Sequence, residues 1–261
     1  YYDDAVVARP NRRVLSHLRE GNPALLLGRQ GGAVGSESWD VVFAVDTLVD
    51  QNIFRRGGGT VFPLSLHPGT AAARPNLTAA FLDECAARLG QPVAPDDAFA
   101  YLYAVLHAPV YRRRYAVPLR YDFPRLPVTA QPRLFHRLCG AGRALLALHL
   151  GRTARPPVTP CPAGDAPIVE RVRYTPPHAG APGRVWIDAR QGIDGVPPAV
   201  WAFRIGGYRV CEKWLKDRAG RPLTAADLAH YRHLVAALAE TLRLMAEIDA
   251  AIDAHGGWPM R

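Results

Sequence analysis

The sequence predicts a mixed α/β fold of the α+β type, in which a helical hairpin and a long C-terminal helix pack with a small mixed sheet. Three observations predict it: apolar residues at helical spacing in the middle and at the end, strand-length apolar runs near the start, and long loops in the second half. The 261 residues form either one large domain or two lobes, 1–150 and 151–261. Either can bury a substantial core without disulfides.

The chain is expected to be a reduced, cytoplasmic protein without a membrane partner. Its four cysteines include no CxxC pair, so neither a zinc site nor a disulfide framework is indicated. No apolar run approaches the roughly 18 residues of a membrane span, and the first residues do not resemble a signal peptide. The first residue is not methionine, which suggests a fragment of a longer chain.

Positive charge is in excess. The chain has 32 Lys and Arg against 23 Asp and Glu, a net charge of +9 and a pI near 9.8. This surplus is typical of proteins that bind nucleic acid, although a basic surface also binds other anions. Only Lys213 and Lys216 are lysines. A GC-rich genome explains the preference for arginine, but not the excess of cations over anions.

The N-terminal part is predicted to contain a short helix and three strands. Pro10 favours a helix over 11–20, which Gly21 ends. Three apolar runs are predicted to be strands: 23–28, 40–49 and 60–66.

Three successive glycines follow Arg55 and Arg56 in the connection before the third strand. Glycine permits positive φ and close backbone approach, so exposed amides there could bind a phosphate. The segment lacks the GxxxxGK[ST] spacing of a nucleotide-binding loop, and a plain connecting turn is the more common structure for such a run. Both arginines are candidate phosphate contacts.

A helix is predicted over 77–89. Asn76 is placed to cap its first turn and Gly90 to end it. Cys85 lies on its apolar face and is expected in the core.

The segment 99–127 is predicted to form a helical hairpin with a basic tip. Asp96 and Asp97 favour a helix N-terminus, and apolar residues then recur at helical spacing. Pro109 suits the first position of a second short helix. Pro124 disfavours a helical conformation of the residue before it, so 122–127 is expected to be extended. The short helix carries three consecutive arginines that cannot all be buried and are candidate DNA contacts: Arg112, Arg113 and Arg114.

Arginines also dominate the region that follows. Between 109 and 143 there are eight arginines against one acid, Asp122, and three of the eight lie on a further helix predicted over 132–150. A run of charges usually marks a solvated helix face. Eight arginines with so little compensation favour a phosphate-facing surface, because Arg forms bidentate contacts with phosphate and with guanine.

Residues 151–198 are predicted to carry two short strands, 168–174 and 184–188, on long loops rich in proline and glycine. Binding residues are often borne by loops on a rigid scaffold. We expect base discrimination here, because Arg pairs with guanine and Gln with adenine. The candidates are Arg173, Arg184, Arg190 and Gln191.

The segment 201–218 is predicted to form a strand, a glycine break and a short helix over 208–216. Trp214 could stack on a base, but packing in the core is the more common role of such a residue. Three cations lie outside the packing face and are candidate DNA contacts: Lys213, Lys216 and Arg218.

The last predicted helix begins at Thr224, a capping residue followed at the third position by Asp227, and runs to Ile252. Its apolar residues form a nearly heptad seam. This seam could pair with another chain as a coiled coil or lie against helices of its own chain.

Several segments resemble the C-terminal specificity domain of type ISP restriction-modification enzymes. YLYAVLHAPVYRRRYAVPLRYDFPRLP, at 101–127, is similar to the family pattern YxYAVLHxPxYRxxYAxxLxxDFPRIP. NIFRRGGGTVFPLS, at 52–65, is similar to NxFxxGGGxxFPLY, and 230–249 is similar to HYxxxVxALxETIRLMxEID. The segment 201–218 is a second strong match. The resemblance favours an intrachain position for the last helix.

This resemblance implies a DNA target-recognition domain of a large single-chain bacterial DNA translocase. Its partners would be double-stranded DNA and the methyltransferase and translocase modules of the same parent chain. The domain would direct adenine-N6 methylation and gate cleavage. It would hold no cofactor itself, whereas the parent enzyme would use S-adenosylmethionine, ATP and Mg.

Motifs for catalysis are missing from the sequence. There is no NPPY or DPPY motif, no FxGxG loop, no Walker motif and no PD-ExK-like cluster. No spacing typical of metal ligands stands out among the histidines. We therefore expect a non-catalytic domain. The alternative function is a protein-interaction module that docks through its basic face and its C-terminal helix.

Overall fold

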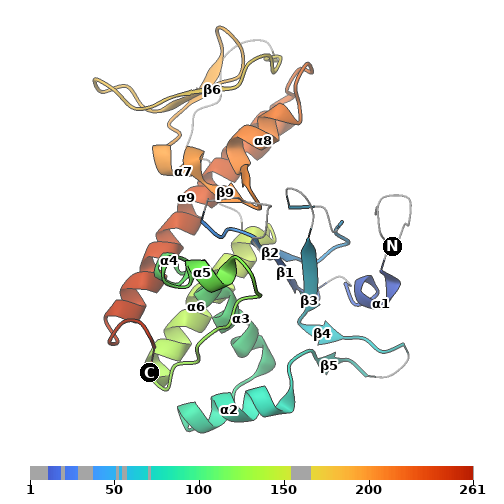
Figure 1. Cartoon of the computed structure of the whole chain (residues 1–261). Coiled ribbons are helices and arrows are strands. Elements are labelled where there is room, and N and C mark those ends of the chain that lie inside the picture. Colours follow the sequence, from blue (N-terminus) through green and yellow to red (C-terminus); the bar gives the residue numbers. More distant parts are fainter. Residues whose placement is uncertain are drawn as a thin grey trace. The chain divides into compact units, whose positions relative to one another are not determined.

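The computed structural model describes residues 11–18, 21–28, 38–50, 53–54, 58–69, 72–153 and 166–260 (Figure 1). Helices and small sheets are both present, which confirms the expected α+β class. The sheets differ from the expected mixed sheet, because every pair of described strands runs antiparallel.

The chain divides into two compact units. The first combines Tyr1–Arg152 with Leu244–Arg261, and the second is Thr153–Arg243. The boundary between Arg152 and Thr153 lies close to the expected one after residue 150. The C-terminal segment belongs to the first unit, so a further boundary, between Arg243 and Leu244, falls inside the last helix, α9 (Ala225–Asp253).

A three-stranded sheet in the order β2-β1-β3 lies in the first unit. Its strands are β1 (Ala24–Gly28), β2 (Val42–Val45) and β3 (Gly59–Pro63). The central strand β1 is buried along its whole length, which explains its continuous apolar sequence. The expected third strand, 60–66, is interrupted at Leu64. Beyond it the chain forms a separate ribbon of β4 (Ser65–Leu66) and β5 (Arg74–Pro75).

The first helix, α1 (Arg12–Leu15), is shorter than the expected 11–20. After Leu15 the backbone is held by other contacts. The His17 carbonyl oxygen accepts a hydrogen bond from Asn22 Nδ2 at 2.7 Å, and His17 Nδ1 accepts one from His67 N at 3.0 Å.

Helix α2 (Ala79–Leu89) begins two residues later than expected and is capped by Thr78, not by Asn76. The Thr78 hydroxyl accepts a hydrogen bond from Phe81 N at 3.3 Å. The Asn76 amide is used elsewhere, because its Nδ2 donates to the Pro63 carbonyl oxygen at 3.0 Å. Gly90 ends the helix with φ 67°, as expected.

Helices α3 (Pro95–His107) and α6 (Pro132–His149) pack closely in the first unit. Gly142 is the point of closest approach, since a Cβ atom there would lie 1.9 Å from the Ala100 carbonyl oxygen. The expected apolar side of α6 is buried. Both helices therefore confirm the periodicity of the sequence.

The hairpin continues with α4 (Pro109–Arg114) and α5 (Ala116–Leu119). The chain then runs without regular structure, as expected for 122–127. Two buried tyrosines hold this segment. Tyr111 Oη donates to the Arg125 carbonyl oxygen at 3.0 Å, and Tyr101 Oη donates to the Pro127 carbonyl oxygen at 2.7 Å.

The second unit contains an antiparallel sheet in the order β6-β7-β8. Its strands are β6 (Arg173–Thr175), β7 (Arg184–Trp186) and β8 (Gly192–Asp194). β7 lies within the expected strand 184–188, whereas β6 extends one residue beyond the expected strand 168–174. Both are shorter than expected, and β8 was not expected. Val185 and Ile193 face the core of the unit, where they belong to one cluster with Leu215 and Tyr231.

The expected strand at 201–205 is wrong in its first part. Trp201 lies in α7 (Pro198–Ala202), where its N–H donates to the Pro197 carbonyl oxygen at 3.0 Å. Pro198 at the first helical position favours this helix. A small hairpin of β9 (Arg204–Ile205) and β10 (Tyr208–Arg209) follows, and α8 spans Val210–Lys216.

Helix α9 begins with the expected capping box. Asp227 N donates to Thr224 Oγ1, and Thr224 N donates to Asp227 Oδ2, both at 3.1 Å. Its apolar seam is buried within the chain, at Tyr231 and Val235 in the second unit and at Ile248 in the first. This confirms the intrachain interpretation. Among the described residues, no helix has the length and apolar character needed to cross a membrane.

Candidate nucleic-acid interface

Arg112, the first arginine of the hairpin tip, is held inside the first unit. Its Nε donates to the Leu106 carbonyl oxygen at 2.7 Å, and its guanidinium lies 5.7 Å from the ring centre of the buried Trp39. Burial lowers the pKa of Arg112 to about 10, an effect that the Asp40 carboxylate opposes. The side chain is charged at neutral pH but occupied by its own chain. We therefore remove Arg112 from the candidate DNA contacts.

Arg113 and Arg114 follow on the same helix and are exposed. Other exposed arginines lie in the hairpin and on α6: Arg120, Arg125, Arg133 and Arg137. Arg143 pairs with Asp97, and Arg125 lies 3.3 Å from Asp122. No carboxylate of the described residues pairs with Arg114, Arg120, Arg133 or Arg137. We call Arg113, Arg114, Arg120, Arg133 and Arg137 the arginine surface.

The C-terminal segment of the first unit holds the hairpin. Asp249 accepts hydrogen bonds from Val110 N at 3.2 Å (Oδ1) and 3.1 Å (Oδ2), in the first turn of α4. Burial raises the pKa of this carboxyl, while that hydrogen bond and then the nearby Arg113 oppose the rise. The Trp258 ring centre lies 5.7 Å from that of Tyr111. The helix that bears the arginines is thus anchored at its start and on its inner side.

A buried polar cluster lies beside Arg112. Tyr103 Oη is 2.6 Å from His149 Nδ1, and His107 Nδ1 donates to the Tyr103 carbonyl oxygen at 2.9 Å. Burial and the positive charge of Arg112 lower the pKa of His149 to about 4 and that of His107 well below its ordinary value. Both imidazoles are therefore neutral at neutral pH. The cluster supports the base of the hairpin.

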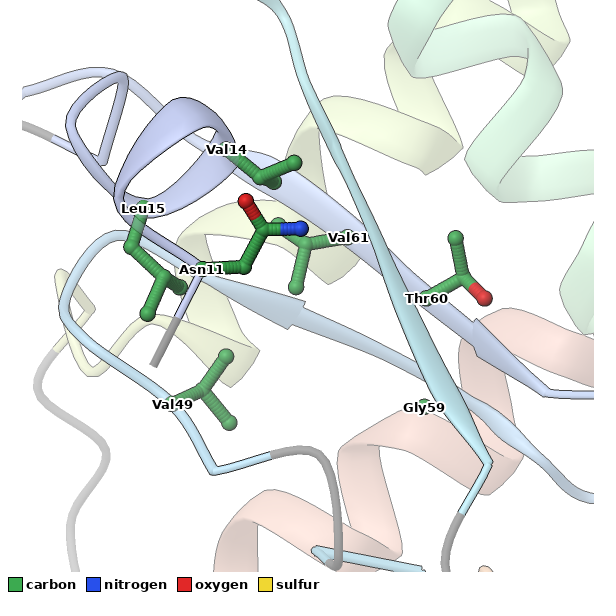
Figure 2. Close-up of a pocket in the computed structure, with 7 residues that line it drawn as sticks. All are labelled: Asn11, Val14, Leu15, Val49, Gly59, Thr60 and Val61. Carbon is green, nitrogen blue, oxygen red and sulfur yellow. The ribbon is translucent and has the colours of Figure 1, made fainter. Parts of the chain in front are cut away.

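Arg55 and Arg56 lie outside the described residues, so their phosphate contact stays a prediction. The described part of that connection borders a cavity of about 230 Å³ (Figure 2). Thr60 and Val61 project to opposite sides of β3 at this cavity (Figure 2). None of the described residues that line it has an ionisable side chain: Asn11, Val14, Leu15, Val49, Gly59, Thr60 and Val61.

The outer face of the β6-β7-β8 sheet joins two of the predicted base-reading residues. Strand alternation turns one set of side chains away from the core, and we call this set the arginine–tryptophan face: Arg173, Thr175, Arg184, Trp186 and Asp194. The guanidinium carbons of Arg173 and Arg184 lie 5.2 and 4.4 Å from the Trp186 ring centre. Arg184 Nη1 pairs with Asp194 at 3.1 Å.

Arg190 and Gln191 lie in the turn that connects β7 to β8. Asp188 Oδ1 accepts hydrogen bonds from both backbone N–H groups at 2.6 Å, which fixes the turn. The Arg190 side chain is exposed, whereas Gln191 Oε1 is buried and has no hydrogen-bond partner among the described residues. The turn therefore presents Arg190, and Gln191 is less accessible.

The charges of Lys213, Lys216 and Arg218 are balanced locally. Lys213 pairs with Asp217 at 2.7 Å, Lys216 with Glu212 at 2.6 Å and Arg218 with Asp227 at 3.4 Å. These three are weaker candidates for phosphate contact than the arginine surface, because their neighbouring carboxylates repel phosphate.

Trp214 packs against its own chain. The Arg218 guanidinium lies 3.5 Å from its ring centre, and the His230 ring stacks on it at 5.6 Å. This arrangement supports the packing interpretation and leaves little of the ring for a base.

Residues 1–247 match the sequence model of the Type ISP C-terminal specificity domain. The chain belongs to this family. Comparison with curated proteins gives no match.

Solved structures share the fold of this specificity domain. One is the cryoEM structure of a DrdV–DNA complex, with a TM-score of 0.69 and 23% identity over 87% of this chain. Another is the ATP-dependent Type ISP restriction-modification enzyme LlaBIII bound to DNA, with a TM-score of 0.71 and 17% identity over 95%. A third is a nuclease-deletion mutant of the Type ISP restriction-modification enzyme LlaGI in complex with a DNA substrate mimic. Its TM-score is 0.59, with 18% identity over 87% of this chain. The specificity domain covers 25%, 17% and 18% of those chains.

The cysteines of the specificity domain give no reactive thiol in the described part. Cys85, Cys139 and Cys211 are free and buried, and burial raises the pKa of Cys139 and Cys211 to about 12. Cys161 lies outside the described residues. The described residues also contain no group of three His, Cys, Asp or Glu side chains that could hold a metal ion.

Sequence reasoning missed three members of the arginine–tryptophan face: Thr175, Trp186 and Asp194. Trp186 and Asp194 were not candidates, because β8 was not expected and Trp186 was treated only as part of a strand. Side chains two residues apart in a strand lie on the same face, so the sequence of β7 could have placed Trp186 beside Arg184. Asp194 required knowledge of the β7-β8 register.

Proposed function

We propose that this domain recognises duplex DNA and directs the adenine-N6 methyltransferase and restriction activities of a larger type ISP enzyme. Its family membership and three structural neighbours that are bound to DNA support this function. The arginine surface is the observation that carries it. Four of its five arginines have no ion-pair partner among the described residues, as a surface that neutralises phosphates requires.

The two units supply different kinds of contact in this proposal. The arginine surface of the first unit grips phosphates, which fixes the register of the protein on the DNA without selecting a sequence. The β6-β7-β8 sheet and its loops in the second unit approach base edges, where sequence is read. The methyltransferase module of the parent chain flips the target adenine into its own pocket. The specificity domain holds no cofactor and does no chemistry, whereas the parent enzyme uses S-adenosylmethionine, ATP and Mg.

The salt dependence of binding tests this function. The purified chain should bind duplex DNA, and the logarithm of its association constant should fall linearly with the logarithm of salt concentration. The double variant R113A/R114A should weaken binding to all sequences and reduce the salt slope by about one unit for each lost phosphate contact.

A matched control is the double variant R88A/R243A. It removes the same charge, but each arginine is paired with a carboxylate, Glu84 and Glu240 respectively, at 2.8 Å. The control R88A/R243A should change the salt slope of DNA binding by less than R113A/R114A does. An unchanged slope in R113A/R114A would remove the arginine surface from the interface.

The alternative of a protein-interaction module is weakened by α9. The alternative requires the apolar seam of this helix to pair with a partner, and the seam is buried in the chain itself at Val235 and Ile248. If an acidic protein, but not duplex DNA, bound the chain and competed for the arginine surface, this alternative would replace the proposed function.

A further inference from the structure

Two cations share one aromatic ring on the arginine–tryptophan face. Trp186 Nε1 donates to Thr175 Oγ1 at 2.9 Å, which fixes the ring, and the guanidinium groups of Arg173 and Arg184 lie over it. Among the described residues, Asp194 is the carboxylate that pairs with Arg184, and none pairs with Arg173. The face therefore has a net positive charge and a rigid centre.

The Arg184 side chain is held in place but not saturated with hydrogen bonds. Asp194 binds its Nη1, while its Nε is buried without a partner among the described residues. The side chains of Arg184 and Asp194 are 31% and 41% exposed, so both can reach a ligand.

Gly192 makes room for this arrangement. A Cβ atom there would lie 2.9 Å from Arg184 Nε and 2.6 Å from the Val185 carbonyl oxygen. The absence of a side chain at Gly192 thus leaves the space that the Arg184 side chain occupies.

We infer that Arg184 and Asp194 together read one G·C base pair in the major groove of the recognised DNA. The inference rests on the proposed function. A G·C pair presents the N7 and O6 acceptors of guanine and then the N4 amino donor of cytosine. Arg184 supplies donors for guanine, and the adjacent Asp194 supplies an acceptor for cytosine. The pair of side chains thus matches the pattern of one base pair.

A base edge fits this site better than a phosphate does. Asp194 cancels most of the attraction that Arg184 alone would exert on a phosphate, and its own charge repels one. Hydrogen bonds to base edges depend on direction, which the Trp186 platform and the carboxylate fix before binding. The exposed arginines of the first unit have no such fixed geometry and suit phosphates.

The test is a selection of binding sites from duplexes with randomised base pairs, using the 261-residue chain. The wild-type chain should select a site that contains a G·C pair essential for binding. The variant R184A should lose preference at that pair by about tenfold. Its affinity for DNA without the site should change less than about twofold, because phosphates contribute that binding.

Two further variants separate the possible roles of Arg184. R184K keeps the charge but lacks the planar fork, so it should lose the preference as R184A does. R209A is the matched control, since Arg209 is a partly exposed arginine of the same unit that lies 3.7 Å from Glu212. It should keep the preference. Thermal midpoints close to that of the wild type establish that the variants are folded. If R184A does not fold, the base preference of R184K alone tests the inference.

Several outcomes would overturn the inference. Retained preference in R184K or R184A would show that the fork is not needed. An equal loss of affinity for all sequences would make Arg184 a phosphate contact. A wild-type chain that binds DNA without any preference would overturn this inference alone, whereas a chain that binds no DNA would overturn the proposed function with it.

Discussion

A buried guanidinium stabilises a fold only while its neighbours satisfy it. Arg112 meets this condition through the Leu106 carbonyl oxygen, the Trp39 ring and the charge of Asp40. The neighbouring Arg113 and Arg114 have no such packing. Three consecutive arginines therefore divide into one structural residue and two available for a ligand.

Truncation of Arg112 should destabilise the chain. R112A leaves the Leu106 carbonyl oxygen without its donor, so the free energy of unfolding should fall by about 1 to 3 kcal/mol. R113A should change it by less than about 0.5 kcal/mol, because that side chain is exposed. Urea unfolding of the two variants makes the comparison. Equal stabilities would contradict the structural role of Arg112.

Acid should destabilise the first unit through its buried histidines. Unfolded His149 binds a proton near its ordinary pKa of 6.5, whereas the folded chain binds it only near pH 4. The unfolded state therefore takes up protons first, and stability is lost as the pH falls from 6.5 towards 4. Each such histidine contributes up to about 1.4 kcal/mol per pH unit.

Urea unfolding at pH 7, 6 and 5 measures this effect. The variant H149F removes one titrating group and should therefore have a shallower dependence of stability on pH than the wild type. A wild-type stability that is constant over this range would show that the imidazoles are not held neutral.

Helix packing depends on glycine at one position of α6. G142A would place its Cβ 1.9 Å from the Ala100 carbonyl oxygen, so α3 and α6 would have to separate. We expect the free energy of unfolding to fall by about 3 kcal/mol or more. G140A lies on the same helix, is exposed and has open space around the new methyl group. It should stabilise the chain by about 0.5 to 1 kcal/mol.

Thermal unfolding of G142A and G140A distinguishes packing from helix propensity. A stabilising effect of both substitutions would mean that α3 and α6 are not in close contact at Gly142.

The long helices could be predicted from the sequence, whereas α7 and β8, which are short, could not. α3, α6 and α9 each extend over several turns, so their apolar residues repeat often enough to define a face. α7 has five residues, and Trp201 with Phe203 fits a strand as well as a helical turn. β8 has three residues and gives no period at all.

The roles of the charged residues depended on neighbours distant in the sequence. Arg112 is structural because the fold brings Trp39 beside it, and Arg184 is paired because β8 brings Asp194 beside it. Neither neighbour could be found by spacing along the chain. The exposed positions on α6, by contrast, followed from its amphipathic pattern. The arginines of the predicted helix 132–150 lie outside its apolar side, and Arg133 and Arg137 are exposed.

At the scale of the whole molecule, the expected activity is binding alone. Incubation of the purified chain with labelled S-adenosylmethionine and plasmid should leave the DNA unlabelled and uncut, because the motifs of both activities are missing from the sequence. A preparation free of host methyltransferases that still labels the plasmid would disprove the proposal of a non-catalytic domain. Addition of an intact type ISP enzyme to the same mixture is the positive control.

The division of the chain also determines the order in which its units can be completed during synthesis. Translation makes Thr153–Arg243 before Leu244–Arg261, so every residue of the second unit exists while the first unit lacks its last segment. That segment contains Asp249, which binds the first turn of α4, and Trp258, which packs on Tyr111. The arginine-bearing hairpin therefore acquires these two anchors last. Emergence of the C-terminal segment from the ribosome, and not of the hairpin itself, sets the earliest moment at which Asp249 and Trp258 can hold α4.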